Sequence, residues 1–440
     1  MLTNTGYFTE NKELKSQLTV RAVENAMGIR PPSFKVFRET PKGIIVPRYF
    51  GLSEIGPPQK DKRVEPAAAN IQFTGTMRPG TPQPEAFQRG TDAFSTVGGG
   101  VLSLYCGAGK TICALALSSH LKLRTMIVVH KEFLANQWVE RIKEFCPGAT
   151  IGRVQGDLLE TDKDFVIAMI QTMCIREHPR GTFDSVGLLV VDEAHHIGAP
   201  AFSQFMFKMC PKHTLGLTAT PERKDGLTRL LYWFMGPSFC TVERQNQQQV
   251  KVVSVPFDCP EFRQAPPCSY TGKVNLAGIV NQLVDNSERN KIILKLIFNI
   301  KKEKRKLLIL SDRREHCNFL HQNVEGSGLY IGGMSEEELN KSAEKQVIIA
   351  TFSLAHEGLD IPTLDTVLLS TPHSDVKQAV GRILRETKGK VNSPVIYDMK
   401  DNYSVLWAMY RKRLKMYTES GFLIDEEVPK ETLKKKCLLC

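Results

Sequence analysis

The sequence lacks the features that mark membrane, secreted and disordered proteins. No run of about 18 consecutive apolar residues occurs among its 440 residues, so we expect no transmembrane helix. Residues 1–7 have neither a basic flank nor an apolar core, so we expect no secretory signal. Because 42% of the residues are hydrophobic and 24% are charged, most of the chain should fold, and its length suffices for two or three domains.

The eleven cysteines lack a repeated C-x₂-C spacing, and their number is odd. Zinc modules need such paired spacings, so we expect free thiols, a reducing intracellular compartment and no structural zinc site. Acidic residues are the minority, with 47 Asp and Glu against 58 Lys and Arg, which gives a formal net charge of +11. An excess of this size favours a polyanionic partner.

Residues 1–70 have few long apolar runs and several prolines, and they predict a small strand-rich module. The segments 33–38 and 44–50 alternate basic with aromatic or aliphatic residues. That alternation predicts a half-buried sheet with a basic outer face, whose aromatic side chains could stack on bases. The alternative is a packing module with a mildly basic surface.

The rest of the chain predicts two consecutive α/β units without a short-period repeat. Residues 71–240 contain apolar strand candidates at 101–105, 126–129, 165–170, 188–191 and 215–217. Residues 241–274 predict a connector that could include an edge strand. Residues 275–425 repeat the alternation, with a helix at 290–300 and strands at 307–310, 346–350, 366–369 and 395–397, before a basic tail at 426–440. Apolar strands separated by helices are typical of parallel sheets buried on both faces.

A glycine-rich segment joins the first strand of the first unit to a helical pattern at 112–121. It reads Cys106-Gly107-Ala108-Gly109-Lys110-Thr111. Glycines let backbone N–H groups converge on an anion, and the helix start adds its dipole, so the segment predicts a phosphate site. Lys110 would reach the β- and γ-phosphates, and the Thr111 hydroxyl would bind Mg²⁺. The strict pattern requires glycine where the chain has Leu104, so a glycine-rich turn with an incidental lysine is the alternative.

Two adjacent carboxylates follow the strand at 188–191. The string is Asp192-Glu193-Ala194-His195. Ligands of open α/β folds bind at the C-terminal edge of the sheet, where this string would lie. Asp192 would bind Mg²⁺, directly or through water, and Glu193 would polarise the attacking water. The alternative is an ordinary acidic helix N-terminus.

Two further elements complete the pattern. About 20 residues after the carboxylates, Thr218-Ala219-Thr220 ends a strand with two hydroxyls that could bond the preceding strand end. In the second unit, one helix face would carry Gln378, Arg382 and Arg385. An arginine from another domain stabilises the negative charge that builds on the γ-phosphate during transfer. The alternative for this helix is a solvated basic face.

Another strand end carries a glycine and a carboxylate, Gly358 and Asp360, which could contact a nucleic-acid strand and the nucleotide ribose. Together these ordered motifs, over about 75–400, resemble superfamily 2 helicases. The string Leu215-Gly-Leu-Thr-Ala-Thr-Pro-Glu-Arg-Lys-Asp-Gly226 and the arginine helix are similar to DEAH-type DNA helicases of the XPB and phage UvsW group. The likeness is greatest to versions from large DNA viruses, such as the poxviral transcript-release helicase.

The resemblance implies two RecA-like domains, ATP hydrolysis with Mg²⁺ between them, and 3′ to 5′ movement along DNA. By motif, it assigns His195, Thr218 and Thr220 to coupling between hydrolysis and DNA. It also implies an adenine-reading glutamine about 23 residues before the loop, a distance that fits Gln83 and not Gln88.

Other parts of the resemblance concern the path of the nucleic acid. His130-Lys131 and Gln171-Thr172 match motifs that grip its backbone, and such contacts are independent of sequence. Arg223-Lys224-Asp225 is similar to the Arg-Glu-Asp element of XPB with the middle charge reversed. The basic run 301–306 could extend the path, although a solvated helix end is favoured.

The expected partners are nucleic acid, with DNA favoured over RNA, and transcription or replication machinery, but no membrane. The expected location is the nucleus, a viral replication site or the virion. The alternatives are a DNA-binding remodeller or transcript-release factor with little strand separation, and an RNA helicase. Cys437-Leu-Leu-Cys440 has the shape of a prenylation signal, but a solvated basic tail is favoured over prenylation or half of a metal site.

Overall fold

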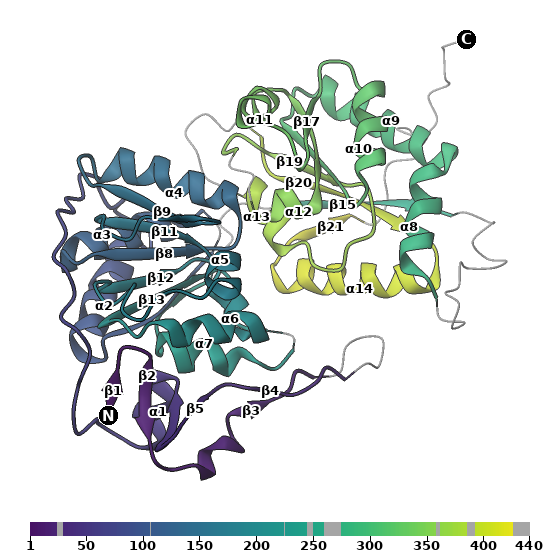
Figure 1. Cartoon of the computed structure of the whole chain (residues 1–440). Coiled ribbons are helices and arrows are strands. Elements are labelled where there is room, and N and C mark those ends of the chain that lie inside the picture. Colours follow the sequence, from purple (N-terminus) through teal and green to yellow (C-terminus); the bar gives the residue numbers. More distant parts are fainter. Residues whose placement is uncertain are drawn as a thin grey trace. The chain divides into compact units, whose positions relative to one another are not determined.

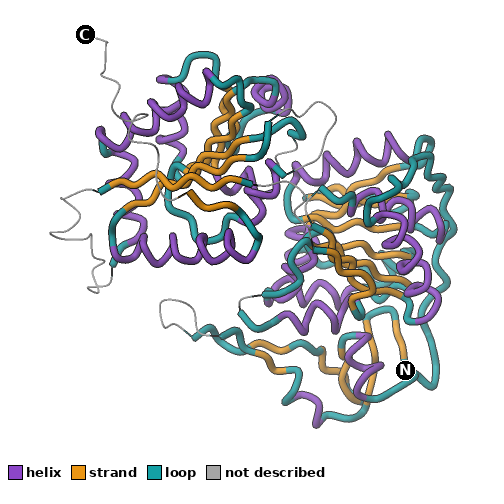
Figure 2. Tube along the Cα trace, turned by 180° about the vertical axis from the view of Figure 1, so that it is seen from behind, coloured by secondary structure: helices purple, strands orange, loops and turns teal. Residues whose placement is uncertain are grey.

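The computed structural model describes residues 1–23, 30–105, 107–223, 225–243, 250–258, 274–357, 361–384 and 392–425. The chain forms two compact units, Met1–Arg244 and Gln245–Cys440 (Figures 1 and 2). Each unit contains a large, mainly parallel sheet with helices on both faces. The predicted α/β class with two tandem RecA-like domains is therefore confirmed, as is the strand-rich N-terminal segment.

The first sheet has the strand order β10-β9-β11-β8-β12-β13-β7-β14. Its strands are β7 (Gly99–Leu104), β8 (Thr125–Val129), β9 (Ile151–Gln155), β10 (Leu158–Leu159), β11 (Phe165–Met169), β12 (Leu188–Val191), β13 (His213–Thr218) and β14 (Ser238–Val242). All neighbours pair in parallel except β9 and β10. All five strand candidates of this unit correspond to strands of this sheet, although β7 ends one residue before Tyr105 and Ile170 begins helix α5 (Ile170–Ile175).

Alternate residues of these strands pack on opposite faces of the sheet. One face is covered by α2 (Gln83–Thr96), α3 (Lys110–Leu121) and α4 (Glu132–Phe145), which pack on residues such as Leu102 and Ile127. The other face is covered by α5, α6 (Pro200–Phe205), α7 (Thr228–Met235) and the 3₁₀ turns η2 (Ala194–Gly198) and η3 (Met206–Lys208). Burial on both faces explains why the strands read as uninterrupted apolar runs.

The N-terminal segment forms an antiparallel sheet and a separate two-stranded ribbon. The elements are β1 (Leu2–Thr3), β2 (Gly6–Thr9), η1 (Glu13–Lys15), β3 (Thr19–Val20), β4 (Phe34–Lys35), β5 (Arg38–Thr40), β6 (Gly43–Val46) and α1 (Arg48–Glu54). Their apolar side chains, among them Val46 and Phe50, belong to the same cluster as Phe207 and Phe234 of the RecA-like domain. This segment therefore completes the core on one face of the first unit.

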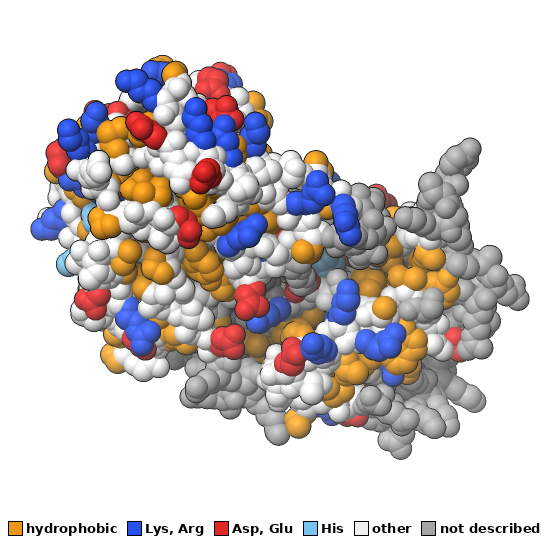
Figure 3. Space-filling model, turned by 90° about the horizontal axis from the view of Figure 1, so that it is seen from below, with side chains coloured by type: hydrophobic (Ala, Val, Ile, Leu, Met, Phe, Trp, Pro, Cys, Tyr) orange, Lys and Arg blue, Asp and Glu red, His pale blue; other side chains and the backbone are white. Residues whose placement is uncertain are grey.

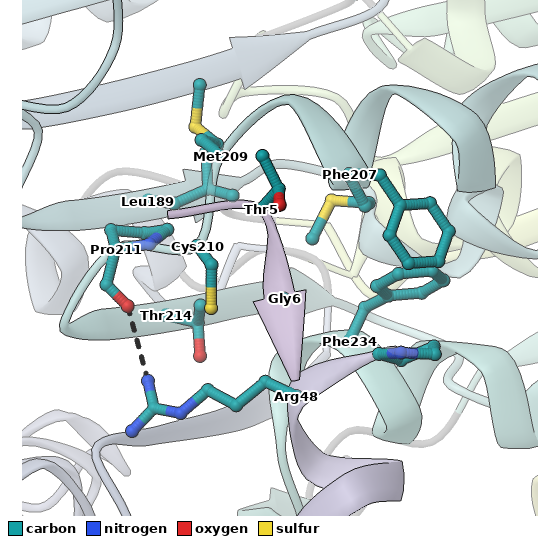
Figure 4. A pocket seen from close by; sticks show the side chains of 12 residues that line it. Thr5, Gly6, Arg48, Leu189, Phe207, Met209, Cys210, Pro211, Thr214 and Phe234 are labelled. Atoms are coloured by element: carbon teal, nitrogen blue, oxygen red, sulfur yellow. Dashed lines mark hydrogen bonds between the residues drawn. The ribbon is translucent and has the colours of Figure 1, made fainter. Parts of the chain in front are cut away.

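The predicted extended segment at 44–50 is wrong beyond Val46, because α1 begins at Arg48 directly after Pro47. The Arg48 side chain is buried instead of lying on a basic outer face. It donates from Nη1 to the carbonyl oxygens of Lys212 at 2.7 Å and Pro211 at 3.3 Å, and from Nη2 to that of Val97 at 3.2 Å. Figure 4 shows the bond to Pro211. One guanidinium thus donates hydrogen bonds to three backbone carbonyls. The alternation of basic and apolar residues in the sequence does not predict this role.

The second sheet is parallel throughout, with the order β17-β18-β16-β19-β20-β15-β21. Its strands are β15 (Lys251–Phe257), β16 (Leu307–Ser311), β17 (Gly328–Tyr330), β18 (Val347–Thr351), β19 (Thr366–Leu369), β20 (Val395–Asp401) and β21 (Leu423–Asp425). Its helices are α8 (Leu276–Asp285), α9 (Ser287–Lys302), α10 (Arg314–Asn323), α11 (Glu336–Ala343), α12 (Phe352–Glu357), α13 (Lys377–Ile383) and α14 (Ser404–Glu419).

Strand β15 falls within the segment predicted as a connector, yet it lies between β20 and β21. Pro256 is tolerated there because β21 pairs only with Lys251–Val253, so the missing N–H of Pro256 breaks no bond on that side. The sequence allows a strand in this segment, but as an edge strand; the structure places it inside the second sheet.

Two buried arginine–carboxylate pairs attach helices α9 and α14 to β20. Arg289 donates to both carboxylate oxygens of Asp401, at 2.7 and 2.9 Å. Arg413 donates to both oxygens of Asp398, at 2.8 and 2.9 Å, and the Tyr417 hydroxyl donates to the same carboxylate at 2.9 Å. Burial raises the pKa of Tyr417 well above its ordinary value, so this hydroxyl stays a donor.

Candidate nucleotide site and coupling elements

The loop between β7 and α3 has the geometry that its glycines predict. Gly107 and Gly109 adopt positive φ angles of 84° and 95°, and Gly109 is the N-cap of α3. The Lys110 ammonium donates to the carbonyl oxygen of Leu104 at 3.1 Å, so the lysine side chain reaches back to the end of β7. Leu104 is the last residue of that strand, with its side chain in the core, so this position needs no glycine. Cys106 lies outside the described residues.

Gln83, at the start of α2, lies against this loop. Its Nε2 donates to the carbonyl oxygen of Ala108 at 3.2 Å, and its Oε1 accepts from the Arg78 backbone N–H at 3.0 Å. A Cβ on Gly109 would lie 2.3 Å from Gln83 Nε2, so a side chain at this position would displace the amide. Gln88, in contrast, is exposed on α2, where its Nε2 donates to Asp92 Oδ1 at 3.2 Å. The adenine-reading role of Gln83 stays a prediction.

Asp192 and Glu193 follow β12 directly. Asp192 Oδ1 accepts from the Glu193 backbone N–H at 3.0 Å, and Oδ2 accepts from the indole N–H of Trp138 at 2.9 Å. Glu193 has φ 47° and ψ 50°, a left-handed conformation that is uncommon for a residue with a side chain. Strands β12 and β7 are parallel and separated by β13, so these carboxylates and the glycine loop share one sheet edge about 10 Å apart.

His195 lies between the carboxylates and the next strand. Its Nδ1 is 3.2 Å from the Thr218 hydroxyl and 3.4 Å from Glu193 Oε2. Thr218 Oγ1 also accepts from the backbone N–H of Thr220 at 3.1 Å. Burial, with the nearby positive charge of Arg223, lowers the pKa of His195 to about 4, so its imidazole is neutral at pH 7. The structure thus brings together the predicted coupling residues His195 and Thr218, and ties Thr220 to them through its backbone.

The motif reasoning did not predict two contacts at this site, one made by Arg223 and one by Trp138. Arg223 donates from Nη1 to the carbonyl oxygen of His195 and forms a paired contact with Asp225, with Nε to Oδ1 at 3.0 Å. The only signal for this role was the likeness of the Arg-Lys-Asp string to an Arg-Glu-Asp element, and Lys224 lies outside the described residues. No sequence pattern predicted the contact of Trp138 with Asp192, because a tryptophan on the apolar face of a helix is expected to be an ordinary core residue.

The two strand ends expected to grip nucleic acid meet in the structure. Gln171 Nε2 donates to the carbonyl oxygen of His130 at 2.7 Å, and Thr172 Oγ1 accepts from the Gly156 N–H at 3.0 Å. Burial lowers the pKa of His130 and of Lys131. Their contacts with nucleic acid stay a prediction.

The basic run 301–306 bonds largely to its own domain. Lys301 Nζ donates to the carbonyl oxygen of Glu325 at 2.6 Å, and Lys306 Nζ donates to those of Ala343 and Glu344 at 2.8 and 3.0 Å. On the face shown in Figure 3, Lys and Arg side chains are interspersed with acidic and apolar ones. The described side chains on that face therefore do not form one continuous basic patch.

In the second unit, Arg382 lies on α13, and its Nε donates to the carbonyl oxygen of Ala355 at 3.2 Å. Gln378 lies on the same helix. Gly358, Asp360 and Arg385 lie outside the described residues, as does the C-terminal tail with Cys437. Across the part of the chain that the structure describes, no helix is both long and apolar enough to span a bilayer.

The oxygen ligands at this edge of the first sheet suit Mg²⁺. The Thr111 hydroxyl and the Asp192 carboxylate are hard oxygen ligands, and Mg²⁺ in nucleotide sites takes one or two protein oxygens together with phosphates and water. Within the described residues, no group of three or more His, Cys, Asp and Glu side chains is placed to hold a metal. A protein cage for a metal is therefore not part of the described site, and a nucleotide would have to supply the remaining ligands.

A glycine loop at a helix start and an acidic strand end on the same sheet edge define a nucleotide hydrolase of the RecA-like class. Residues 76–223 match the family described as type III restriction enzyme, res subunit, and residues 288–387 match the helicase conserved C-terminal domain. The helicase L396 of Acanthamoeba polyphaga mimivirus is 32% identical over 97% of this chain and 85% of its own length. The chain therefore belongs to the superfamily 2 helicase family that includes L396, and it is an ATP-dependent helicase.

Other relatives agree with this assignment. Helicase 161L of Invertebrate iridescent virus 6 is 29% identical over 74% of this chain and 77% of its own length. QP509L of African swine fever virus is 22% identical over 73% of this chain and 69% of its own length. The names of L396 and QP509L describe ATP-dependent RNA helicases. The crystal structure of T4 UvsW is 16% identical and covers 94% of both chains with a TM-score of 0.37, a value too low to add to the assignment.

Proposed function

We propose that this helicase is a nucleic-acid-stimulated ATPase of the DEAH-type XPB and UvsW group, which moves along or unwinds DNA in the 3′ to 5′ direction. The observation that carries the proposal is the contact of His195 with both Glu193 and Thr218. This contact joins the carboxylate that would act on the attacking water to the end of the neighbouring strand. The intact Lys110, Glu193 and Arg382 also favour an active ATPase, because an inactive relative would have no chemical need for all three.

In this proposal the first unit binds the nucleotide. Lys110 and the loop N–H groups would hold the phosphates, while Thr111 and Asp192 would hold Mg²⁺. Mg²⁺, when bound, neutralises charge on the phosphate oxygens. Glu193 would orient the attacking water and accept its proton. Arg382, and with it Arg385, would supply positive charge to the γ-phosphate, an effect worth about 10³–10⁵ in rate where it is known.

The neutral imidazole of His195 would couple hydrolysis to the neighbouring strand end. Its Nδ1 is within hydrogen-bond distance of the Thr218 hydroxyl and lies 3.4 Å from Glu193 Oε2, so a closer approach of Glu193 would compete with the bond to Thr218. A shift of Glu193 during hydrolysis would therefore change the bond to Thr218 at the end of β13. Arg223 would hold the ring in place through the His195 carbonyl.

DNA as the substrate is supported by the likeness of 215–226 to DNA helicases of the XPB group. An RNA duplex is the second candidate, because two relatives are named as RNA helicases. Viral relatives also support a role at a viral replication site, in the nucleus or in the virion, beside transcription or replication machinery.

Strand displacement on DNA and RNA duplexes with 3′ or 5′ overhangs tests the proposal. We expect ATP-dependent displacement of DNA duplexes that carry a 3′ overhang. Displacement of RNA duplexes alone, or only from 5′ overhangs, would overturn the substrate or the direction. ATP hydrolysis without displacement of any duplex would instead favour a remodeller or transcript-release factor.

A further inference from the structure

Trp138 touches the candidate magnesium carboxylate from inside the core. It lies on α4, whose buried face carries Leu134, Ala135, Trp138 and Ile142 at helical spacing. The side chain is 2% exposed and belongs to the apolar cluster under α2 and α3. A buried indole needs an acceptor for its N–H, and here the acceptor is Asp192 Oδ2 at 2.9 Å.

The local fold explains how a core residue reaches the site. Helix α4 begins three residues after β8, and β8 is the direct neighbour of β12, with Val128 opposite Val191. The Asp192 backbone N–H bonds to the carbonyl oxygen of Val128 at 3.0 Å. Trp138, near the middle of α4, therefore lies over the end of β12 and not over a distant part of the sheet.

The two bonds to Asp192 together define its orientation. The Trp138 N–H holds Oδ2, and the Glu193 backbone N–H holds Oδ1, so rotation of the carboxylate would break one of them. An indole N–H is only a donor, so in this bond the Asp192 carboxylate is the acceptor. Hydrogen bonds to a charged acceptor are among the stronger ones in proteins.

We propose that Trp138 is a positioning residue for magnesium binding: its indole N–H fixes the Asp192 carboxylate in the orientation that Mg²⁺–nucleotide requires. The inference rests on the proposed magnesium role of Asp192. Partners that orient a metal ligand in this way change metal affinity or activity by about 10–100-fold when they are removed. Trp138→Phe keeps one aromatic ring in the core and removes the N–H donor together with the second ring of the indole, so its packing cost is measured separately by thermal unfolding.

The test compares the full-length wild-type chain with Trp138→Phe, and uses Trp233→Phe as the matched control. Trp233 lies on α7, where its ring contacts Phe50 and Arg229. For each protein, binding of N-methylanthraniloyl-ADP is titrated with Mg²⁺, and thermal unfolding is followed without nucleotide. We expect Trp138→Phe to raise the half-saturating Mg²⁺ concentration about 10-fold or more, with unchanged Mg²⁺-free nucleotide binding, and Trp233→Phe to match the wild type.

If the half-saturating Mg²⁺ concentration of Trp138→Phe equals that of the wild type, the inference is overturned. If the melting temperature also decreases in that case, Trp138 acts only in packing. If the wild type itself shows no Mg²⁺-dependent nucleotide binding, the proposed function fails instead. Should Trp138→Phe not fold, the ¹H–¹⁵N indole resonance of Trp138 in the wild type gives the answer. The resonance is assigned by elimination, with Trp233→Phe and Trp407→Phe identifying the other two indole signals. We expect the Trp138 resonance to shift when Mg²⁺ is added to the nucleotide complex. If it does not move, the inference is overturned.

Discussion

Replacing Gly109 with alanine tests the phosphate loop at the position where the geometry is most restrictive. The residue has φ 95°, and a left-handed conformation costs a residue with a side chain about 1–2 kcal/mol. The new Cβ would lie 2.3 Å from Gln83 Nε2, so the amide must move and lose its bond to the Ala108 carbonyl, which is worth about 1 kcal/mol. The expected destabilisation is therefore about 2–3 kcal/mol.

The matched control is Gly148→Ala, at φ 89° with no atom within 4 Å of the added Cβ. It carries the conformational cost without the contact with Gln83. Calorimetry should show a lower melting temperature for Gly109→Ala, by roughly 4–12 °C, and a smaller decrease for the control. Binding of a fluorescent nucleotide should weaken at least about tenfold only in Gly109→Ala, because the loop cradles the phosphates.

A double-mutant cycle isolates the contact itself. In a Gln83→Ala background the contact is already absent, so Gly109→Ala should cost less than it does in the wild type. The reasoning is refuted if Gly109→Ala is as stable as Gly148→Ala and binds nucleotide like the wild type.

Two further predictions concern the second unit. Asp398→Asn would leave the Arg413 guanidinium buried without its countercharge, so calorimetry should show a loss of about 3–5 kcal/mol, and a loss below about 1 kcal/mol would contradict the buried-pair account. Burial lowers the pKa of His316 to about 3, whereas an unfolded histidine titrates near 6.5. Below about pH 6.5, His316 is therefore protonated in the unfolded chain but still neutral in the native state. Stability should therefore decrease between pH 6.5 and 3, by about 2 kcal/mol at pH 5, and His316→Gln should show a shallower dependence in denaturant unfolding at several pH values; an equal slope would contradict this.

The sequence predicted those parts of the site whose chemistry forces a residue type. Gly107 and Gly109 need positive φ, and Asp192 and Glu193 end a strand that is apolar throughout, so each pattern has few alternatives. The mismatch at Leu104 arose because the strict pattern asks for glycine where this chain only needs a strand end and a carbonyl oxygen.

The features that sequence reasoning missed depend on contacts between distant segments. Arg48 looked like part of a basic strand, but its guanidinium satisfies carbonyls of loops far along the chain. Trp138 and Arg223 bond to residues 54 and 28 positions away, and neither bond leaves a local pattern. The prolines favoured at most an edge strand in 241–274, but β15 lies between two strands, where Pro256 is tolerated because β21 is short.

The central claim is that ATP hydrolysis at Glu193 is coupled to nucleic acid. It is tested most directly by steady-state ATP hydrolysis with and without single-stranded DNA or RNA, for the wild type and Glu193→Gln. The account predicts that nucleic acid stimulates the wild type, and that Glu193→Gln binds nucleotide normally but loses at least about 100-fold in rate, as expected for removal of a general base. Equal rates for the two proteins, or a wild-type rate that nucleic acid does not change, would contradict it.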